Sequence, residues 1–390
     1  MAVVRIEIDR REPVLNGASF GEAGAYEKVV GMLHFAVDPS LPVNERIADI
    51  QRAPRNAQGA VLSSADFYLL RPVGGGSLFP FTDAEQEDPL TGQRGALLWR
   101  VSARARPPKI FSTNSSAEYW RGDASLIHTD VSARRDVEPP DHVRHYLFAG
   151  TQHTPGTIPP PLADPNTGAR GRHMFNVVDY SPLLRAALVN LDRWVSEGIE
   201  PPPSAVPRLA DGTGVMAETT RPVFAAVPGA QFPDRISRPV RLDFGANAEG
   251  GVLTELPPKV GAPFASIVSA FDADGNEAAG IRSWELRVPL ATFTGWNPRH
   301  PEQGAPGDLM SMMGSTFPLA PTAVARAAAG DPRPSIAERY GGRDDYLQRV
   351  RKAAEAMVAA RHLLAEDVDA VAERAGLLWN FIHEVKLRVT

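Results

Sequence analysis

Glu118 and His153 are the two residues of this sequence whose types and placement best fit catalytic chemistry. Each follows a predicted strand, at 107–114 and at 142–149, and a helical pattern lies between the strands. This order predicts parallel pairing, which brings the side chains after both strands to one sheet edge. A carboxylate there could orient an imidazole as the base that activates a nucleophile. The plainer alternative makes Glu118 a first-turn carboxylate favoured by the helix dipole and His153 a polar loop residue.

Ser19 is the centre of the only G-x-S-x-G motif in the chain, at residues 17–21. A nucleophile elbow needs an apolar strand running into the glycine turn and a helix leaving it. The segment before Ser19 is polar and contains Pro13, and residues 26–37 after it alternate like a strand. We therefore interpret the motif as a glycine-rich turn and keep Ser19 as a secondary candidate nucleophile.

Three further serines lie in contexts that need no catalytic role. Ser115 and Ser116 begin a predicted helix and suit its cap, and Ser77 belongs to the glycine-rich stretch 74–77. No serine is thus predicted beside His153. An acid–base pair without a hydroxyl partner has nothing to activate.

Two patterns resemble metal sites without meeting their requirements. His142 and His145 are three apart on a predicted strand, so they should point to opposite faces and cannot share an ion. Residues 272–277, DADGNE, begin like a calcium loop, but the glycine is out of place and Ser283 stands where a glutamate is needed. We predict a turn between two strands there, and neither a metal nor a cofactor.

The best predicted helix covers residues 179–198, with Ser181 as its cap and Pro182 in its first turn. Its apolar stripe consists of Leu184, Leu188, Leu191 and Val195. A final helical stretch runs from about 344 to 385, with an approximate apolar stripe that includes Val350, Met357 and Val371. By composition and periodicity the chain divides into a β-rich segment 1–73, a glycine-rich seam 74–77, strands and helices at 78–200, a loop-rich β insertion at 201–340 and a C-terminal helical segment 341–390.

Several long blocks resemble a bacterial family of alpha/beta hydrolase domain proteins, in the same order and over nearly the whole chain. They include SADFYLLRPV, FPFTD, PKIFSTNSSAEYWRGDASLIHTD, VRHYLFAGTQH and GDPRPSIAERY. The resemblance implies an α/β fold with a partial parallel sheet and flanking helices, and a serine-hydrolase ancestry. It places the catalytic histidine on His153 and the acid on Glu118, with Asp123 and Asp130 as alternatives for the acid.

The same resemblance exposes a missing segment. In such relatives a long stretch with a G-x-S-x-S-G-R nucleophile turn follows LRPV, whereas here LRPV runs through GGGS directly into LFPFTD. The segment that would carry the serine and the oxyanion donors is therefore expected to be missing between Val73 and Leu78.

Composition narrows the function further. A net charge of -5 without a large basic excess argues against nucleic acid as a partner, and no apolar run is long enough to span a membrane. We expect a cytoplasmic protein that, if active, takes a small-molecule ester. The alternative is a non-catalytic deletion product kept for binding or structure. Loss of central strands would leave the remaining strands with unpaired edges. The N-terminal strands could cover these edges, a homodimer could cover them, or they could stay exposed and leave the protein marginally stable.

Overall fold

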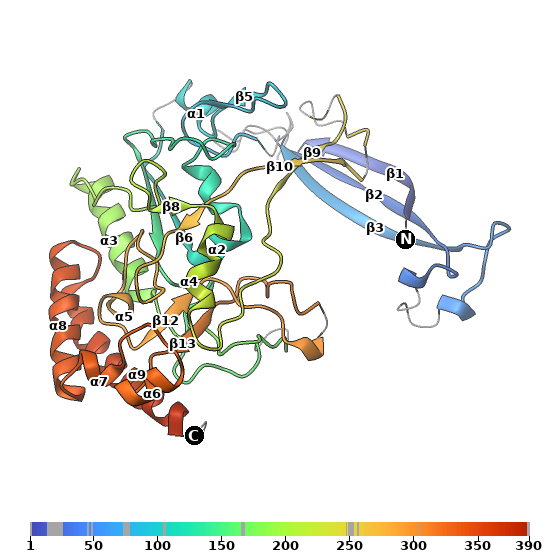
Figure 1. Ribbon diagram of the computed structural model, residues 1–390. Helices are drawn as coiled ribbons and strands as arrows, with labels where there is room; N and C mark the ends of the chain where they lie inside the picture. Colours follow the sequence, from blue (N-terminus) through green and yellow to red (C-terminus); the bar gives the residue numbers. More distant parts are fainter. Residues whose placement is uncertain are drawn as a thin grey trace. The chain divides into compact units, whose positions relative to one another are not determined.

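The structure is a computed structural model that describes residues 2–13, 26–44, 47, 50–72, 79–103, 107–164, 168–246, 248, 253–255, 257–303 and 305–387. The chain divides into two compact units, one of residues 1–78 with 242–261 and one of 79–241 with 262–390 (Figure 1). The predicted seam at 74–77 lies outside the described residues. Residues on both sides of positions 200 and 340, where we drew boundaries, lie in the second unit.

The first unit is built on an antiparallel sheet of three long strands in the order β1-β2-β3. Its β-branched and aromatic runs were predicted as strands, and they pair over their full lengths, with irregularities in the β1–β2 register after Val3 and after Ile8. The strands are β1 (Ala2–Pro13), β2 (Tyr26–Val37) and β3 (Val61–Pro72).

The second unit combines short strands in two-stranded pairs with helices. The pairs are β4 (Gln86–Glu87) with β5 (Arg94–Gly95), β6 (Ile110–Ser115) with β7 (Val143–Phe148), β8 (Gly214–Val215) with β11 (Val268–Ser269), and β12 (Ala291–Thr294) with β13 (Ser315–Pro318). The chain passes between the units through β9 (Val240–Asp243) and β10 (Lys259–Pro263), which also pair. The helices are α1 (Trp99–Ser102), α2 (Ser116–Arg121), α3 (Ser181–Ser196), α4 (Arg221–Ala225), α5 (Trp284–Arg287), α6 (Ala323–Ala328), α7 (Ile336–Arg339), α8 (Arg343–Ala359) and α9 (Val368–Leu387).

The β6–α2–β7 unit forms as the sequence predicted. β6 and β7 pair in parallel, from Ile110 opposite Val143 to Ser115 opposite Phe148. β7 is almost entirely buried, and its other side makes parallel bridges at Ala205 and Ile281. Burial on both sides fits the apolar residues Tyr146, Leu147 and Phe148 that end this strand.

The predicted inward face of α3 is wrong, although its position is right. Leu184, Leu188 and Val195 are exposed, and the buried side carries Leu183, Ala186, Ala187, Asn190 and Trp194. Trp194 packs on Phe111 of β6, and small alanines let the helix approach the core. Ser181 is the first helical residue and not the cap, and its N–H donates to the Asp179 carboxylate at 2.9 Å.

The C-terminal stretch is two helices and not one. α8 ends at Ala359, Arg361 takes a positive φ of 61°, and α9 runs back beside α8. Figure 1 shows α8 next to α3, where Asn190 Nδ2 donates to the Arg361 carbonyl at 2.7 Å. The apolar stripe predicted for one helix instead supplies two helices that share a core, in which Val350, Met357 and Val371 are buried.

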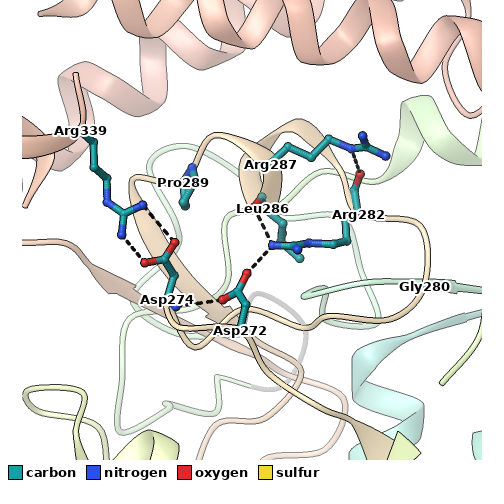
Figure 2. Close-up of a pocket in the computed structure, with 8 residues that line it drawn as sticks. All are labelled: Asp272, Asp274, Gly280, Arg282, Leu286, Arg287, Pro289 and Arg339. Atoms are coloured by element: carbon teal, nitrogen blue, oxygen red, sulfur yellow. Dashed lines mark hydrogen bonds and ion pairs between the residues drawn. The ribbon is translucent and has the colours of Figure 1, made fainter. Parts of the chain in front are cut away.

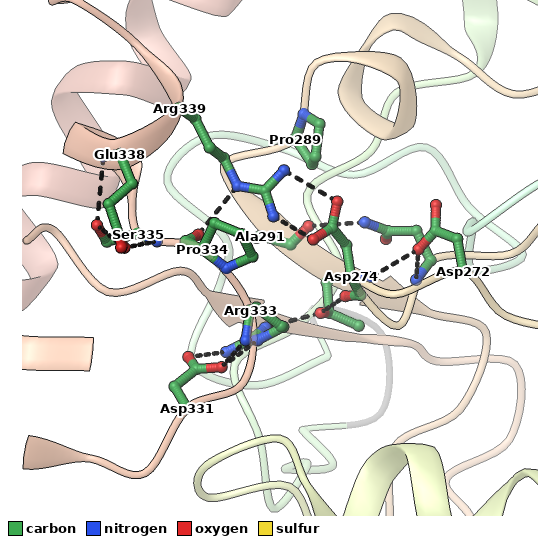
Figure 3. A network of polar contacts seen from close by, with 12 residues as sticks. Asp272, Asp274, Pro289, Ala291, Asp331, Arg333, Pro334, Ser335, Glu338 and Arg339 are labelled. Carbon is green, nitrogen blue, oxygen red and sulfur yellow. Dashed lines mark hydrogen bonds and ion pairs between the residues drawn. The ribbon is translucent and has the colours of Figure 1, made fainter. Parts of the chain in front are cut away.

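A buried ion pair fixes the loop before α7. The Arg333 guanidinium, 2% exposed, bonds both carboxylate oxygens of Asp331 at 2.9 and 2.8 Å (Figure 3). Arg333 also donates to Thr292 Oγ1 and to the Phe317 carbonyl, so it joins β12 to β13. The guanidinium is buried, and Asp331 supplies the negative charge that compensates it.

We expect Asp331→Asn to lower the free energy of unfolding by roughly 3–5 kcal/mol, because it leaves the buried Arg333 charge uncompensated. Asp369→Asn is the matched control: it breaks an exposed pair with Arg351 and should cost under about 1 kcal/mol. Urea denaturation of both variants measures the difference. Equal losses would show that Arg333 does not depend on its partner.

Candidate functional site

The structure brings Glu118 and His153 into direct contact. His153 Nδ1 lies 2.5 Å from Glu118 Oε1. The other carboxylate oxygen, Oε2, accepts from the Ser115 N–H at 2.7 Å and from the Ser115 hydroxyl. Glu118 is the third residue of α2 and Ser115 is its N-cap, so one carboxylate both caps the helix and holds the imidazole. The two interpretations weighed from the sequence are compatible.

The ring of His153 is oriented while its outer nitrogen stays free. The His153 N–H donates to the Met312 carbonyl at 3.1 Å, and the Tyr180 hydroxyl donates to the His153 carbonyl. Because Glu118 accepts at Nδ1, the proton of the neutral ring belongs there and Nε2 carries the lone pair. Within the described ranges Nε2 has no partner, and the His153 side chain is 54% exposed.

Gly150 makes the turn that carries His153 out of β7. It has a φ of +68°, and a Cβ there would lie 2.9 Å from the Leu286 side chain. The backbone conformation therefore requires glycine, and a side chain there would also have to displace Leu286. The Gly150 carbonyl accepts from Asn176 Nδ2 at 2.7 Å, which ties the turn to the core.

Sequence analysis missed Glu277, the last residue of the DADGNE motif. Its fully buried carboxylate accepts through Oε2 from the Ser116 hydroxyl at 2.5 Å and from the Gly150 N–H at 2.8 Å. Burial raises the pKa of Glu277 to about 7. No sequence signal identifies it, because its partners are 161 and 127 residues away.

A pocket of about 330 Å³ adjoins the Glu118–His153 pair. Ala117, next to Glu118, lines it together with Trp120 and residues 309–312. Met312, whose carbonyl binds the His153 N–H, takes a φ of 65°, which is rare for a residue other than glycine. Its walls are mixed: Trp120, Leu309 and Met312 supply apolar surface, and Arg121, Ser237 and Ser311 supply polar groups.

A larger pocket of about 490 Å³ is lined by Asp272 and Asp274 of the 272–276 turn and by Arg282 and Arg339 (Figure 2). Its charges are engaged with one another: Arg282 bonds Asp272 at 2.5 Å, and Arg339 holds both oxygens of Asp274. Despite its size we give this pocket less weight as a substrate site, because none of its lining residues adjoins Glu118 or His153 in the sequence or hydrogen-bonds to either, whereas Ala117 and Met312 of the smaller pocket do so.

The other predicted site residues do not join this pair: Asp123 and Asp130 have other partners, and Ser19 is not among the described residues. Asp123 faces Arg121 at 3.6 Å, and Asp130 accepts from the N–H groups of residues 134 and 135. Among the described residues only Glu118 supplies His153 with a carboxylate. Ser19 lies outside the described residues.

The DADGNE segment is a turn, as predicted, but the element that follows it is the helix α5 and not a second strand. The Asp272 N–H donates to the Asn276 carbonyl at 2.8 Å, and Phe271 faces Glu277 in an antiparallel bridge. Asp272 Oδ1 accepts from two N–H groups inside the turn. Over the ranges the structure describes, no three His, Asp or Glu side chains form a group that could hold a metal ion.

His145 forms a buried contact with Asp83, and in the described residues it shares no metal site with His142. His145 Nε2 lies 3.4 Å from Asp83 Oδ2, and burial lowers the pKa of His145 to about 4. The imidazole is therefore neutral at pH 7 and this contact is not an ion pair.

In the described part of the chain, no helix has the length and apolar character needed to cross a membrane.

Comparison with known families gives one match. A family model described as "Alpha/beta hydrolase domain" matches residues 70–373. Both Glu118 and His153 lie inside the matched range, and so does the predicted seam. No curated protein and no solved structure matches the chain.

Glu277 should make stability depend on pH. Its raised pKa means that the folded state holds a proton that the unfolded state releases above about pH 4.5, so its stabilising contribution is lost as the pH rises to about 7. Burial raises the pKa of Glu277, whereas the hydrogen bonds from Ser116 and Gly150 and the positive charge of Arg282 lower it. Burial, and after it the charge of Glu277, raises the pKa of the Tyr119 hydroxyl.

We therefore expect Glu277→Gln to gain stability relative to the natural chain between pH 5 and pH 8, by up to the order of 3 kcal/mol. Urea titrations of both proteins at the two pH values measure this change. Other titrating groups are common to both proteins and cancel in the comparison. A difference that does not vary with pH would show that Glu277 ionises normally.

Proposed function

Since the chain belongs to the alpha/beta hydrolase domain family, we propose that Glu118 and His153 are the acid and base of a serine-type ester hydrolase site. The observation that carries this proposal is the 2.5 Å contact of His153 Nδ1 with Glu118, which leaves Nε2 free near a pocket. In this arrangement a carboxylate fixes the tautomer of a general base.

The chemistry follows from the protonation of the ring. Nε2 takes a proton from a hydroxyl or a water molecule, and the oxygen so activated bonds to the carbonyl carbon of the ester. Glu118 stabilises the imidazolium that forms, as its carboxylate lies at Nδ1. The tetrahedral intermediate expels the alcohol oxygen, which takes the proton back from Nε2.

We further propose that this chain turns over esters poorly because the segment with the nucleophile elbow is missing between Val73 and Leu78. In the described ranges no serine hydroxyl bonds to His153 Nε2, in agreement with that interpretation. Ser115 and Ser116 are engaged by Glu118 and Glu277. In this proposal His153 activates a water molecule in place of a serine hydroxyl. The N–H donors that would stabilise the oxyanion belong to the missing segment and are lost with it.

The pocket beside the pair favours esters with one small group, which would meet apolar side chains and also the polar groups of Arg121, Ser237 and Ser311. Trp120, Leu309 and Met312 offer apolar surface, and about 330 Å³ accommodates a short acyl or alcohol portion. The second candidate function is a non-catalytic binding protein that uses the same pocket. The free Nε2 favours the enzyme, and the unfilled position of the serine favours the binding protein.

We expect the full chain to hydrolyse p-nitrophenyl acetate slowly, and His153→Ala to reduce the protein-dependent rate to background. Glu118→Gln should lower the rate about tenfold or more, because the amide no longer stabilises the imidazolium. Asp123→Asn is the control and should keep the natural rate. Hydrolysis that survives in His153→Ala would remove His153 from the mechanism, and no hydrolysis at all would leave the binding protein.

A fluorophosphonate probe tests the missing nucleophile. We expect no serine to be labelled at a rate above that of the unfolded chain, because no hydroxyl is activated by His153. Intact-mass measurement of the natural chain and of Ser19→Ala gives the answer. Labelling that Ser19→Ala abolishes would make Ser19 the nucleophile and would overturn the proposal of an impaired site.

A further inference from the structure

We propose that Glu277 is a positioning residue for the Glu118–His153 pair, because its carboxylate ties the start of α2 to the turn that carries His153. The inference rests on the proposed function for its chemical meaning. Its geometry stands separately, on contacts between three segments that are distant in sequence.

The contacts form one continuous chain of donors and acceptors. The Thr151 N–H donates to Ser116 Oγ at 3.2 Å, the Ser116 hydroxyl donates to Glu277 Oε2, and the same oxygen accepts from the Gly150 N–H. The Ser116 N–H in turn donates to Thr151 Oγ1 at 3.4 Å. The first residue of α2 is thereby joined to the first two residues after Ala149.

These joined residues stand directly beside the pair. Ser116 precedes Glu118 by two residues in the first turn of α2, and Thr151 precedes His153 by two residues in the loop. The distance between the carboxylate and the imidazole therefore depends on how α2 is held against this loop. Glu277 is the group that bonds to both.

Glu277 is itself held by a rigid turn. Asn276 Oδ1 accepts from the Phe293 N–H at 2.9 Å and Asn276 Nδ2 donates to the Ala291 carbonyl, so the turn is fixed to β12. Arg282 and Arg339 hold Asp272 and Asp274 from outside the turn (Figures 2 and 3). The residue that reaches the site thus has a fixed base.

A buried carboxylate is a costly choice for a purely structural contact. Glu277 is fully buried, and Oε1 has no hydrogen-bond partner among the described residues. A buried polar group with one oxygen unpartnered calls for an explanation beyond packing. The contacts of Oε2 support one such explanation, which is that Glu277 holds the Glu118–His153 pair in place.

The test reads the Glu118–His153 hydrogen bond by NMR, on the full chain labelled with ¹⁵N-histidine. The Nδ1 proton of His153 is assigned as the resonance that His153→Ala removes. We expect Glu277→Leu to speed its exchange with water by about tenfold or more, or to abolish it, because α2 and the loop lose their common anchor. Glu277→Gln should restore slow exchange, because the amide oxygen can accept from the same two donors.

Glu285→Leu is the matched control for lost stability. Glu285 is another fully buried glutamate, and its pKa is likewise raised to about 7 by burial, but it has no hydrogen bond to Ser116 or Gly150. The Nδ1 resonance should be unchanged in this variant. Loss of the resonance in Glu285→Leu as in Glu277→Leu would overturn the proposal, and so would wild-type exchange in Glu277→Leu.

Should Glu277→Leu fail to fold, Ser116→Ala removes the hydroxyl link and should still speed the exchange severalfold. Unchanged exchange in Ser116→Ala would count against Glu277. Because the readout is not turnover, it separates the two proposals. A chain without esterase activity whose resonance responds as expected would refute the proposed function and retain Glu277 as a positioning residue.

Discussion

The site depends on one carboxylate that serves two partners. Glu118 caps α2 through Oε2 and holds the His153 ring through Oε1, so the start of the helix and the imidazole are tied to one carboxylate. Such sharing is possible because β6 and β7 run in parallel and deliver α2 and the His153 loop to the same edge. A single residue thus connects local helix chemistry with the proposed base.

Around this carboxylate the protein uses buried polar contacts in place of a large sheet. Within the residues that the structure describes, β6 and β7 form a two-stranded pair, and the parallel bridges of β7 to Ala205 and Ile281 extend the pair without making a full sheet. The turn at 272–276 and the buried Arg333–Asp331 pair fix the neighbouring β12. Polar groups in such positions specify a single arrangement because each alternative leaves a buried donor or acceptor unsatisfied.

The errors made from the sequence concern burial. In α3 both the leucine stripe and the face of Leu183, Ala187 and Trp194 have helical spacing, so periodicity could not decide which one the core would cover. Ala186, Ala187 and the contact of Trp194 with Phe111 decided it through close approach. Similarly, the stripe from 344 to 385 continues across a reversal at Arg361, which a periodic pattern does not record.

The sequence by itself determined the β6–α2–β7 unit, its parallel order and the placement of Glu118 and His153 after its strands, because each depends on neighbours within a few tens of residues. Only the tertiary structure decided that the two side chains touch, which face of α3 is buried and that Glu277 reaches the site. The Glu118–His153 contact joins residues 35 apart in the sequence, and the contacts of Glu277 join residues 127 and 161 apart. Which donors and surfaces meet across such a separation is set by packing the whole unit, and no local pattern carries that information.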